Sequence, residues 1–317
     1  MLAAAWILFC VCAAAFAAEP GKLPSVMILA TGGTIAGTGA SSTATVGYQS
    51  ATVGVQRLIE ANELLAQGDV DGIVITHGTD TIEETAYFLN LVVKSRKPVV
   101  IVGAMRPSTA ISADGPINLY NAVTLAGSQD AVGKGVLVVL NDQINGARDV
   151  TKTNTANTDT FRNWEFGFMG YMQDNAPHFY RVSTRKHTAD TEFDVSKLDA
   201  LPQVDIVYGY ASMNRVAVDA FVAAGAKAIV HAGVGDGSLA RPAVEPALIE
   251  ARKKGVIIVR SSRVGNGIIA RNGEAKDDEM DYVVSDTLNP QKARILVMLA
   301  LTKTNDTKEI QRMFYTY

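Results

Sequence analysis

The sequence predicts an α/β protein with two domains: a larger N-terminal domain built on a doubly wound, mainly parallel sheet, and a smaller C-terminal α/β domain. Short apolar segments alternate with segments of helical periodicity, which is the pattern of βαβ units. This alternation occurs twice, on either side of a polar, irregular stretch at 182–204. The chain has 317 residues, of which 48% are hydrophobic and 19% charged, so it is long enough for two globular cores.

The N-terminal domain is expected to span residues 22–181. Its strands are nearly continuous apolar runs, typical of strands buried on both faces, and are expected at 25–30, 72–76, 98–103 and 135–140. Its helices carry an apolar face and are expected at 53–67, from a cap at Thr79, Asp80 or Thr81 to about 94, and from a cap at Asp114 onward. A glycine turn should follow the first strand, and residues 37–47, rich in Gly, Ser and Thr, should form a mobile loop.

The C-terminal domain is expected to span residues 205–317, with 182–204 as the linker. Strands are expected at 205–208, 228–231 and 256–260. Helices are expected at 215–224, 245–254 and 290–301. Pro290 suits the first turn of the last helix, with which the chain should close, because proline lacks the N–H that this position leaves unpaired.

The first residues predict a signal peptide over residues 1–17 and export to the periplasm. Residues 2–18 carry no charged side chain, and Ala15-Phe16-Ala17 fits a small-x-small cleavage site. The alternative is an uncleaved membrane anchor, but the apolar run is short for a membrane span. Cys10 and Cys12 both lie in this segment, so the mature chain would contain no cysteine and no disulfide.

Charge and motif content exclude several function classes. The net charge is −3 with both signs interspersed, which gives no case for a nucleic acid or an anionic membrane as partner. Cys and His residues show no metal-ligand spacing, and we expect no metal. The glycine turn could cradle a phosphate, but the nucleotide-binding signatures Gly-x-Gly-x-x-Gly and Gly-Lys-Ser/Thr are absent from the sequence.

Two hydroxyl–glycine motifs follow predicted strands, at 31–34 (Thr-Gly-Gly-Thr) and at 77–80 (His-Gly-Thr-Asp). The carboxyl ends of parallel strands face one crevice, so we expect Thr34, Thr79 and Asp80 to converge there. Threonine is a weak nucleophile that needs a neighbouring base. Backbone N–H groups at Gly33 and Gly78 could hold an oxyanion. These parts indicate acyl transfer, most simply hydrolysis of an amide.

Two bases are available for the two threonines. Tyr48, the aromatic residue of the predicted loop, could take the proton of Thr34. Alternatively, Lys152 could take the proton of Thr79 while Asp80 orients the group.

Each of these residues also has a structural interpretation. Thr34 and Asp80 could be helix caps, Lys152 a solvated surface lysine, and Tyr48 a loop aromatic without a role. His77 is interpreted as a packed or hydrogen-bonded residue. From the residues alone, a hydrolase is only slightly favoured over an anion-binding module.

Four segments carry a resemblance to a known family. Residues 30–37 read Ala-Thr-Gly-Gly-Thr-Ile-Ala-Gly, and residues 75–85 read Ile-Thr-His-Gly-Thr-Asp-Thr-Ile-Glu-Glu-Thr. Residues 146–153 read Gly-Ala-Arg-Asp-Val-Thr-Lys-Thr, and residues 288–294 read Leu-Asn-Pro-Gln-Lys-Ala-Arg. These segments resemble the bacterial type II, periplasmic L-asparaginases and the glutaminase-asparaginases, and the resemblance spans nearly all of the mature chain.

The resemblance implies a cofactor-independent homotetramer that hydrolyses asparagine, and glutamine as a second substrate, with release of ammonia. It implies Thr34 as the nucleophile and Tyr48 as its activating partner on a lid. It makes Thr79, Asp80 and Lys152 a second triad, with Asp80 also holding the α-amino group of the substrate. It further implies that Glu274 reaches the site of a neighbouring subunit; the alternative is that Glu274 is merely solvated.

The chain departs from the family pattern in two places. The start of one family helix runs directly into the end of the next between Ala61 and Asn62, so a strand and a carboxylate-binding serine of the relatives are expected to be missing. Asp236 stands where relatives usually place asparagine, and its carboxylate could weaken binding of an anionic substrate. We therefore expect weak or absent activity, and a non-catalytic, amino-acid-binding remnant of the family is the alternative.

Overall fold

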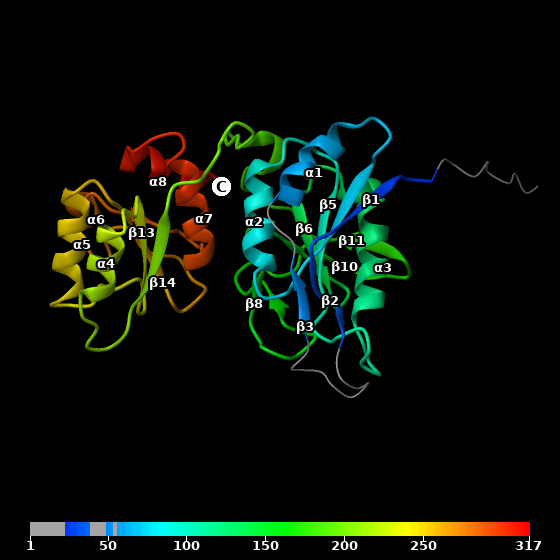
Figure 1. Ribbon diagram of the computed structural model, residues 1–317, viewed down its shortest axis with the longest axis horizontal. Coiled ribbons are helices and arrows are strands. Elements are labelled where there is room, and N and C mark those ends of the chain that lie inside the picture. The colour runs from blue at the N-terminus through cyan, green and yellow to red at the C-terminus, as the bar shows by residue number, and fades with distance from the viewer. Residues whose placement is uncertain (1–22, 39–48, 53–55) are drawn as a thin grey trace, which may run out of the picture.

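The computed structural model describes residues 23–38, 49–52 and 56–317. Figure 1 shows two lobes, with the N-terminal α/β domain in blue to green and the C-terminal α/β domain in yellow to red. The predicted signal peptide, Tyr48 and most of the predicted loop at 37–47 lie outside the described residues. The predicted two-domain α/β fold is confirmed.

A seven-stranded sheet organises the N-terminal domain, in the order β1-β4-β5-β6-β7-β10-β11. The first four strands in this order are parallel and are those the sequence predicts: β1 (Val26–Ala30), β4 (Gly72–Thr76), β5 (Val99–Val102) and β6 (Val136–Leu140). The remaining three run antiparallel: β7 (Gln143–Gly146), β10 (Gly170–Gln173) and β11 (Ala176–Phe179). The mainly parallel sheet is therefore extended by an antiparallel edge.

Helices cover both faces of this sheet because its strands are apolar on both faces. Ile73 and Ile75 of β4 point into the core shared with α2 (Ile82–Val92), whereas Val74 points into the core shared with α3 (Gly115–Ala126). This alternation is the two-residue period of a strand. The remaining helix, α1 (Gln56–Ala66), runs unbroken across Ala61 and Asn62, as the joined helix in the sequence predicts.

Several local predictions are wrong. Residues expected as a glycine turn and loop form strand β2 (Gly32–Thr38), which pairs with β3 (Gln49–Thr52). The helix predicted to begin after a cap at Thr79, Asp80 or Thr81 does begin at Ile82, with Thr81 at the N-cap position, although Thr81 makes no side-chain capping bond. Asp114 occupies the N-cap position of α3 without a capping bond, because its carboxylate accepts the N–H groups of Met105 and Arg106 instead.

The C-terminal domain contains a four-stranded parallel sheet. Its order is β12-β13-β14-β15, from β12 (Val204–Tyr208), β13 (Ala228–Gly233), β14 (Ile257–Ser262) and β15 (Val283–Val284). Its helices are α4 (Val216–Ala223), α5 (Val244–Lys253), α6 (Asp277–Met280), α7 (Pro290–Ala300) and α8 (Thr307–Thr316). The chain thus closes with α8, and not with the helix that begins at Pro290. The short strands β8 (Thr151–Lys152) and β9 (Phe161–Arg162) and two 3-10 turns, η1 (Gln129–Ala131) and η2 (Thr188–Asp190), complete the fold.

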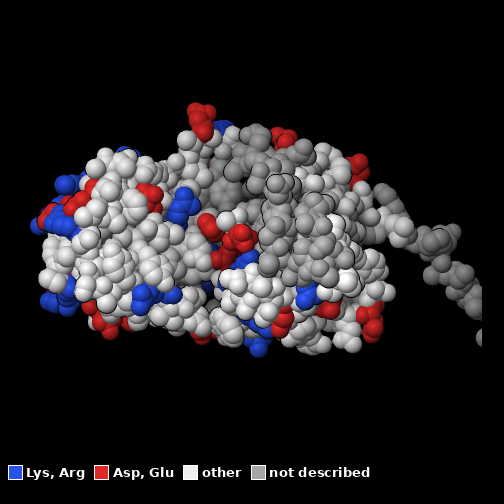
Figure 2. Space-filling view, turned by 60° about the horizontal axis from the view of Figure 1, so that its bottom comes forward, with Lys and Arg blue, Asp and Glu red and all other residues white. Residues whose placement is uncertain are grey.

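The two domains share one core at their junction. Helix α7 packs on β12, β13 and β14 of its own sheet and also against α2 of the N-terminal domain, and Figure 1 shows α2 and α7 facing each other between the lobes. Leu89 of α2 and Leu296 of α7 belong to the same buried cluster. In the face that Figure 2 presents, basic and acidic side chains are interspersed, in keeping with the small net charge.

Strand β1 is an apolar strand at one edge of the large sheet. Among the described strands it pairs with β4 alone, although its sequence, Val-Met-Ile-Leu-Ala, suits a strand buried in the middle of a sheet. As a result Met27 is 41% and Ile28 49% exposed. An uncharged, apolar edge strand is a template for pairing with another chain.

Introducing a charge at this edge is expected to reduce self-association. The change Ile28→Lys should lower light scattering of the concentrated protein and cost about 0.5 kcal/mol of stability or less, because the side chain is half exposed. Ile111→Lys is the matched control, since Ile111 is also exposed but lies outside any strand. Equal scattering by the parent and both variants would show that β1 does not drive association.

His231 in β13 provides a pH-dependent element of stability. Its ring is fully buried, and neither ring nitrogen has a hydrogen-bond partner among the described residues. Burial, together with the positive charge of Arg260, lowers the pKa of His231 from 6.5 to about 4. Below pH 6.5 the unfolded chain binds a proton that the folded chain excludes, so folding stability is lost as the pH falls toward 4.

We expect this histidine to cost about 3 kcal/mol of unfolding free energy between pH 6.5 and 4, and nothing above that window. The measurement is urea unfolding of the parent and of His231→Leu at several pH values. The difference in unfolding free energy between the two should change in favour of the variant as the pH falls. A difference that stays constant with pH would disprove the role of His231.

Candidate active site

The ends of β4 and β8 bring three of the predicted residues together. Lys152 Nζ lies 3.0 Å from Thr79 Oγ1 and 2.6 Å from Asp80 Oδ1. Thr79 is buried, the Lys152 side chain is 18% exposed, and the Asp80 side chain is 91% exposed. In this group of three residues, Thr79 is therefore fixed by burial, whereas Asp80 is open to a ligand. The interpretation of Lys152 as a solvated lysine is wrong.

Backbone contacts fix the turn that carries Thr79. Strand β4 ends at Thr76, whose carbonyl oxygen accepts the hydroxyl of Thr31, and the N–H of His77 donates to the carbonyl of Val102 on β5. Gly103 lies beneath the turn, where a Cβ atom would approach the His77 carbonyl oxygen to 2.8 Å and Thr79 Cγ2 to 3.0 Å. A side chain at position 103 would thus displace Thr79. Sequence analysis did not single out this glycine.

His77 stabilises the same turn and does not face the triad. Its Nδ1 lies 2.8 Å from the carbonyl oxygen of Gly78 and therefore donates, while its Nε2 lies 2.9 Å from Thr85 Oγ1 and accepts. Burial lowers the pKa of His77, against the opposing effect of its bond to Gly78, which favours this neutral form. The interpretation of His77 as a hydrogen-bonded structural residue is confirmed.

The first hydroxyl–glycine motif lies in β2, which runs beside β4. Gly33 pairs with Ala51 of β3, and Thr34 follows within the strand. The alternative that Thr34 caps a helix is therefore wrong. The side chain of Thr34 and all of Tyr48 lie outside the described residues, so their meeting in the crevice stays a prediction.

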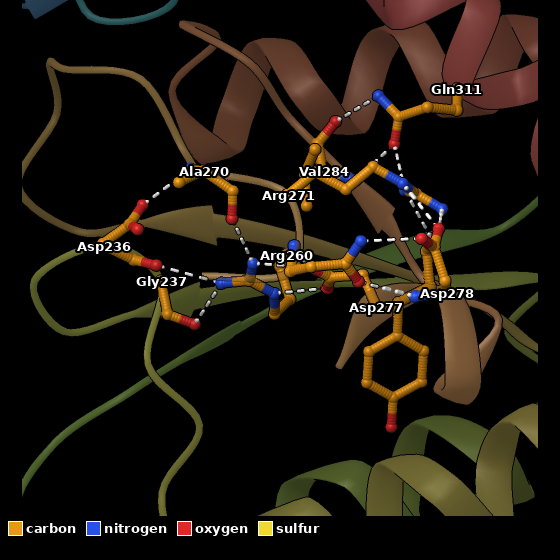
Figure 3. Close-up of polar contacts among 11 residues, drawn as sticks. Asp236, Gly237, Arg260, Ala270, Arg271, Asp277, Asp278, Val284 and Gln311 are labelled. Atoms are coloured by element: carbon orange, nitrogen blue, oxygen red, sulfur yellow. Dashed lines mark hydrogen bonds and ion pairs between the residues drawn. The ribbon is translucent and has the colours of Figure 1, made fainter. Parts of the chain in front are cut away.

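Asp236 and Glu274 lie in the C-terminal domain, apart from the contacts of the triad. Figure 3 shows Asp236 directed at the backbone of Ala270, where its Oδ1 accepts the N–H at 2.9 Å. The carboxylate therefore anchors the loop that carries Glu274. A contact of Asp236 with substrate stays a prediction. Glu274 itself is exposed and makes no hydrogen bond to the described residues.

A buried ion pair holds the other side of this loop. Arg260 donates from Nε and Nη2 to both carboxylate oxygens of Asp277, at 2.6 and 2.7 Å, and both side chains are fully buried. Arg260 also donates to the carbonyl oxygens of Asp236 and Ala270, as Figure 3 shows. Bidentate geometry and satisfied donors are what a buried pair needs to offset desolvation. The backbone on both sides of Glu274 is thus fixed.

None of the helices in the described part of the chain is long and apolar enough to cross a membrane.

Family models match both domains. The model of the asparaginase N-terminal domain matches residues 54–185, and that of the glutaminase/asparaginase C-terminal domain matches residues 203–314. L-asparaginase 2 of Bacillus subtilis is 54% identical, covering 96% of this chain and 89% of the relative. Glutaminase-asparaginase of Pseudomonas fluorescens is 50% identical, covering 93% and 91%.

The alignment with the B. subtilis protein spans 338 positions, more than the 317 residues of this chain. The relative therefore carries residues that this chain lacks, in agreement with the internal deletion that the sequence predicts.

A solved structure agrees with the sequence comparisons. The probable cytoplasmic L-asparaginase from Campylobacter jejuni superposes with a TM-score of 0.87 at 45% identity, covering 93% of this chain and all of that one. With both family models matched and the fold shared over nearly the whole length, this chain belongs to the asparaginase and glutaminase-asparaginase family of amidohydrolases.

Proposed function

We propose that this protein hydrolyses L-asparagine, and L-glutamine as a second substrate, to the corresponding acid and ammonia. The observation that carries the proposal is the contact of Lys152 with both Thr79 and Asp80 at the ends of neighbouring elements of the N-terminal domain. A hydroxyl within hydrogen-bond reach of an amine that a carboxylate orients is an arrangement for activating an oxygen nucleophile.

The proposed reaction proceeds in two steps. In the first, Thr34 Oγ1 attacks the side-chain amide carbon while Tyr48 accepts its proton, and the backbone N–H at Gly33 helps to hold the oxyanion. The C–N bond then breaks, the nitrogen takes the proton that Tyr48 accepted, and ammonia leaves an ester on Thr34.

In the second step a water molecule attacks the carbonyl carbon of the ester. Thr79 accepts a proton of this water and passes its own to Lys152, whose ammonium Asp80 stabilises. The carboxylate of Asp80, which is open to solvent, also accepts the α-amino group of the substrate, while the turn at Gly78 lines the same site. The bond between this carbon and Thr34 Oγ1 then breaks, the proton held at Lys152 returns to Thr34, and the new acid leaves.

We also propose a homotetramer in which Glu274 completes the site of a neighbouring subunit. Two features support assembly: Glu274 is exposed on a loop that is fixed on both sides, and the antiparallel end of the large sheet presents a patch of exposed aromatic and apolar side chains. This patch comprises Trp164, Phe166, Tyr171, Tyr180 and Val182. Exposed apolar patches of this kind mark interfaces between proteins.

We further propose export to the periplasm after removal of residues 1–17, and a division of the mature chain at the linker 182–204. A relative from Haemophilus influenzae, 44% identical, is named a probable periplasmic L-asparaginase. The apolar signal segment of this chain supports the same compartment.

The lost segment is expected to weaken turnover, because the α-carboxylate of the substrate has fewer partners and the β1 edge is exposed. The test combines an ammonia assay on asparagine with size-exclusion chromatography of the same preparation. Ammonia release below that of the full-length relatives supports the proposal. If ammonia is absent but aspartate binds in calorimetry, the chain is the non-catalytic, amino-acid-binding remnant.

A further inference from the structure

Residues 288–294 match the family, yet no residue of this segment has a role in the reaction proposed above. They form the start of α7, on the C-terminal side of the domain junction. We propose that Gln291 and Lys292 of α7, together with Glu83 of α2, form a bracket that positions Lys152 against Thr79. The proposal rests on the proposed function for its catalytic consequence, but the bracket itself rests on contacts within the chain.

Glu83 links the start of α2, which follows Asp80, to the backbone of Lys152. It lies in the first turn of α2, three residues after Asp80, and is 6% exposed. Its Oε2 accepts the backbone N–H of Lys152 at 3.1 Å. The segment that leads from Asp80 into the first turn of α2 therefore also fixes the backbone of β8, the strand that carries Lys152.

Gln291 holds Glu83 in this orientation. Its side-chain amide donates to Oε1 of Glu83, from a position 208 residues away in the sequence. Both carboxylate oxygens of Glu83 are then engaged by N–H groups, so the buried carboxylate is satisfied and cannot turn away from Lys152 without losing a bond.

Lys292 fixes the backbone just before Lys152. Its Nζ donates to the carbonyl oxygen of Arg148 at 2.8 Å and to that of Val150. The side chain is almost fully buried, and burial lowers the pKa of Lys292 to about 8, although the nearby carboxylates Glu83 and Asp149 oppose this shift. A buried amine with two carbonyl acceptors holds the turn at 148–150 in one conformation.

Helix α7 is itself immobilised at this end. Asn289 caps it by accepting the N–H of Lys292 at 3.1 Å, and the hydroxyl of Ser261 donates to the carbonyl oxygen of Leu288. Because α7 also packs on the C-terminal sheet, the C-terminal domain sets the position of Lys152 in the N-terminal site. A displacement of about 1 Å at a reacting group can cost about a hundredfold in rate.

The bracket is tested with two single variants and one exchange. Gln291→Glu, which sets two carboxylates against each other, and Lys292→Met should each lower kcat for asparagine about tenfold, with KM within about threefold, because Lys152 loses its alignment. The double variant E83Q/Q291E exchanges carboxylate and amide and can restore both hydrogen bonds. It should recover kcat to within about threefold of the parent. Glu84→Gln, on the same helix turn but without a contact to β8, is the matched control and should keep the parent kcat.

A second readout does not depend on activity. The rate at which an amine-specific acetylating reagent modifies Lys152, followed by peptide mass spectrometry, should rise about two- to fivefold in Gln291→Glu, because a displaced Lys152 loses its ion pair with Asp80. It should return to the parent rate in E83Q/Q291E. This pattern supports the bracket even if the parent releases no ammonia, in which case the proposed function fails alone.

Three results would overturn the bracket. The first is that the parent is active and both single variants have the same kcat as the parent. The second is a double variant that melts at the parent temperature yet stays as slow as Gln291→Glu. The third is unchanged labelling of Lys152 in Gln291→Glu.

Discussion

Replacing Lys152 by methionine is expected to lower kcat for asparagine by about a hundredfold to ten-thousandfold, the usual contribution of a positioned proton-transfer group. The side chain of methionine fills the same space but can neither accept the proton of Thr79 nor pair with Asp80. The measurement is steady-state ammonia release at saturating asparagine. Stability should change by about 1 kcal/mol or less, because the Asp80 partner is exposed.

Lys276→Met is the matched control for this change. Lys276 also pairs with a carboxylate, that of Glu279, but both side chains are exposed and lie outside the triad. The control should retain the parent kcat. If Lys152→Met also keeps a kcat within about threefold of the parent, Lys152 does not transfer the proton.

Replacing Thr34 by valine is expected to remove turnover while leaving the binding of aspartate within about threefold of the parent. Valine matches threonine in shape, and a nucleophile acts mainly in the transition state, so product binding should persist. The measurements are ammonia release and calorimetry with aspartate. Thr79→Val provides the comparison, since it should slow release of the acid and not abolish formation of the ester.

Two outcomes would contradict this assignment of Thr34. A Thr34→Val variant that still releases ammonia at the parent rate would exclude Thr34 as the nucleophile. A variant that loses aspartate binding together with turnover would show that Thr34 acts in ground-state binding.

The parallel part of the fold was predictable because its strands are apolar on both faces and alternate with amphipathic helices. The antiparallel strands were not, because their signal lies in turns: Asn141-Asp142 and Asp174-Asn175 adopt positive φ, as hairpin turns require. Helix α8 was missed although it begins after Asp306, whose side chain accepts the N–H of Lys308 as a cap. Asp306 was the available signal for that helix.

The site was predictable where residues follow strand ends, as Thr79 and Asp80 do after β4. Before the resemblance, Lys152 was only one of two possible bases, since nothing local distinguishes it from a surface lysine; the resemblance placed it in the triad. Glu83, Gln291 and Lys292 could not be predicted as partners, because their contacts join segments up to 208 residues apart. Asp236 was expected to face substrate, but its bond to Ala270 depends on how two loops fold together.

The most direct test compares ammonia release from asparagine by the purified parent chain, Thr34→Val and Lys152→Met in one assay. The account predicts that the parent releases ammonia and aspartate in equal amounts, even if slowly, and that both variants fall to background or close to it. A parent that releases no ammonia, or variants that release it as fast as the parent, would contradict the account.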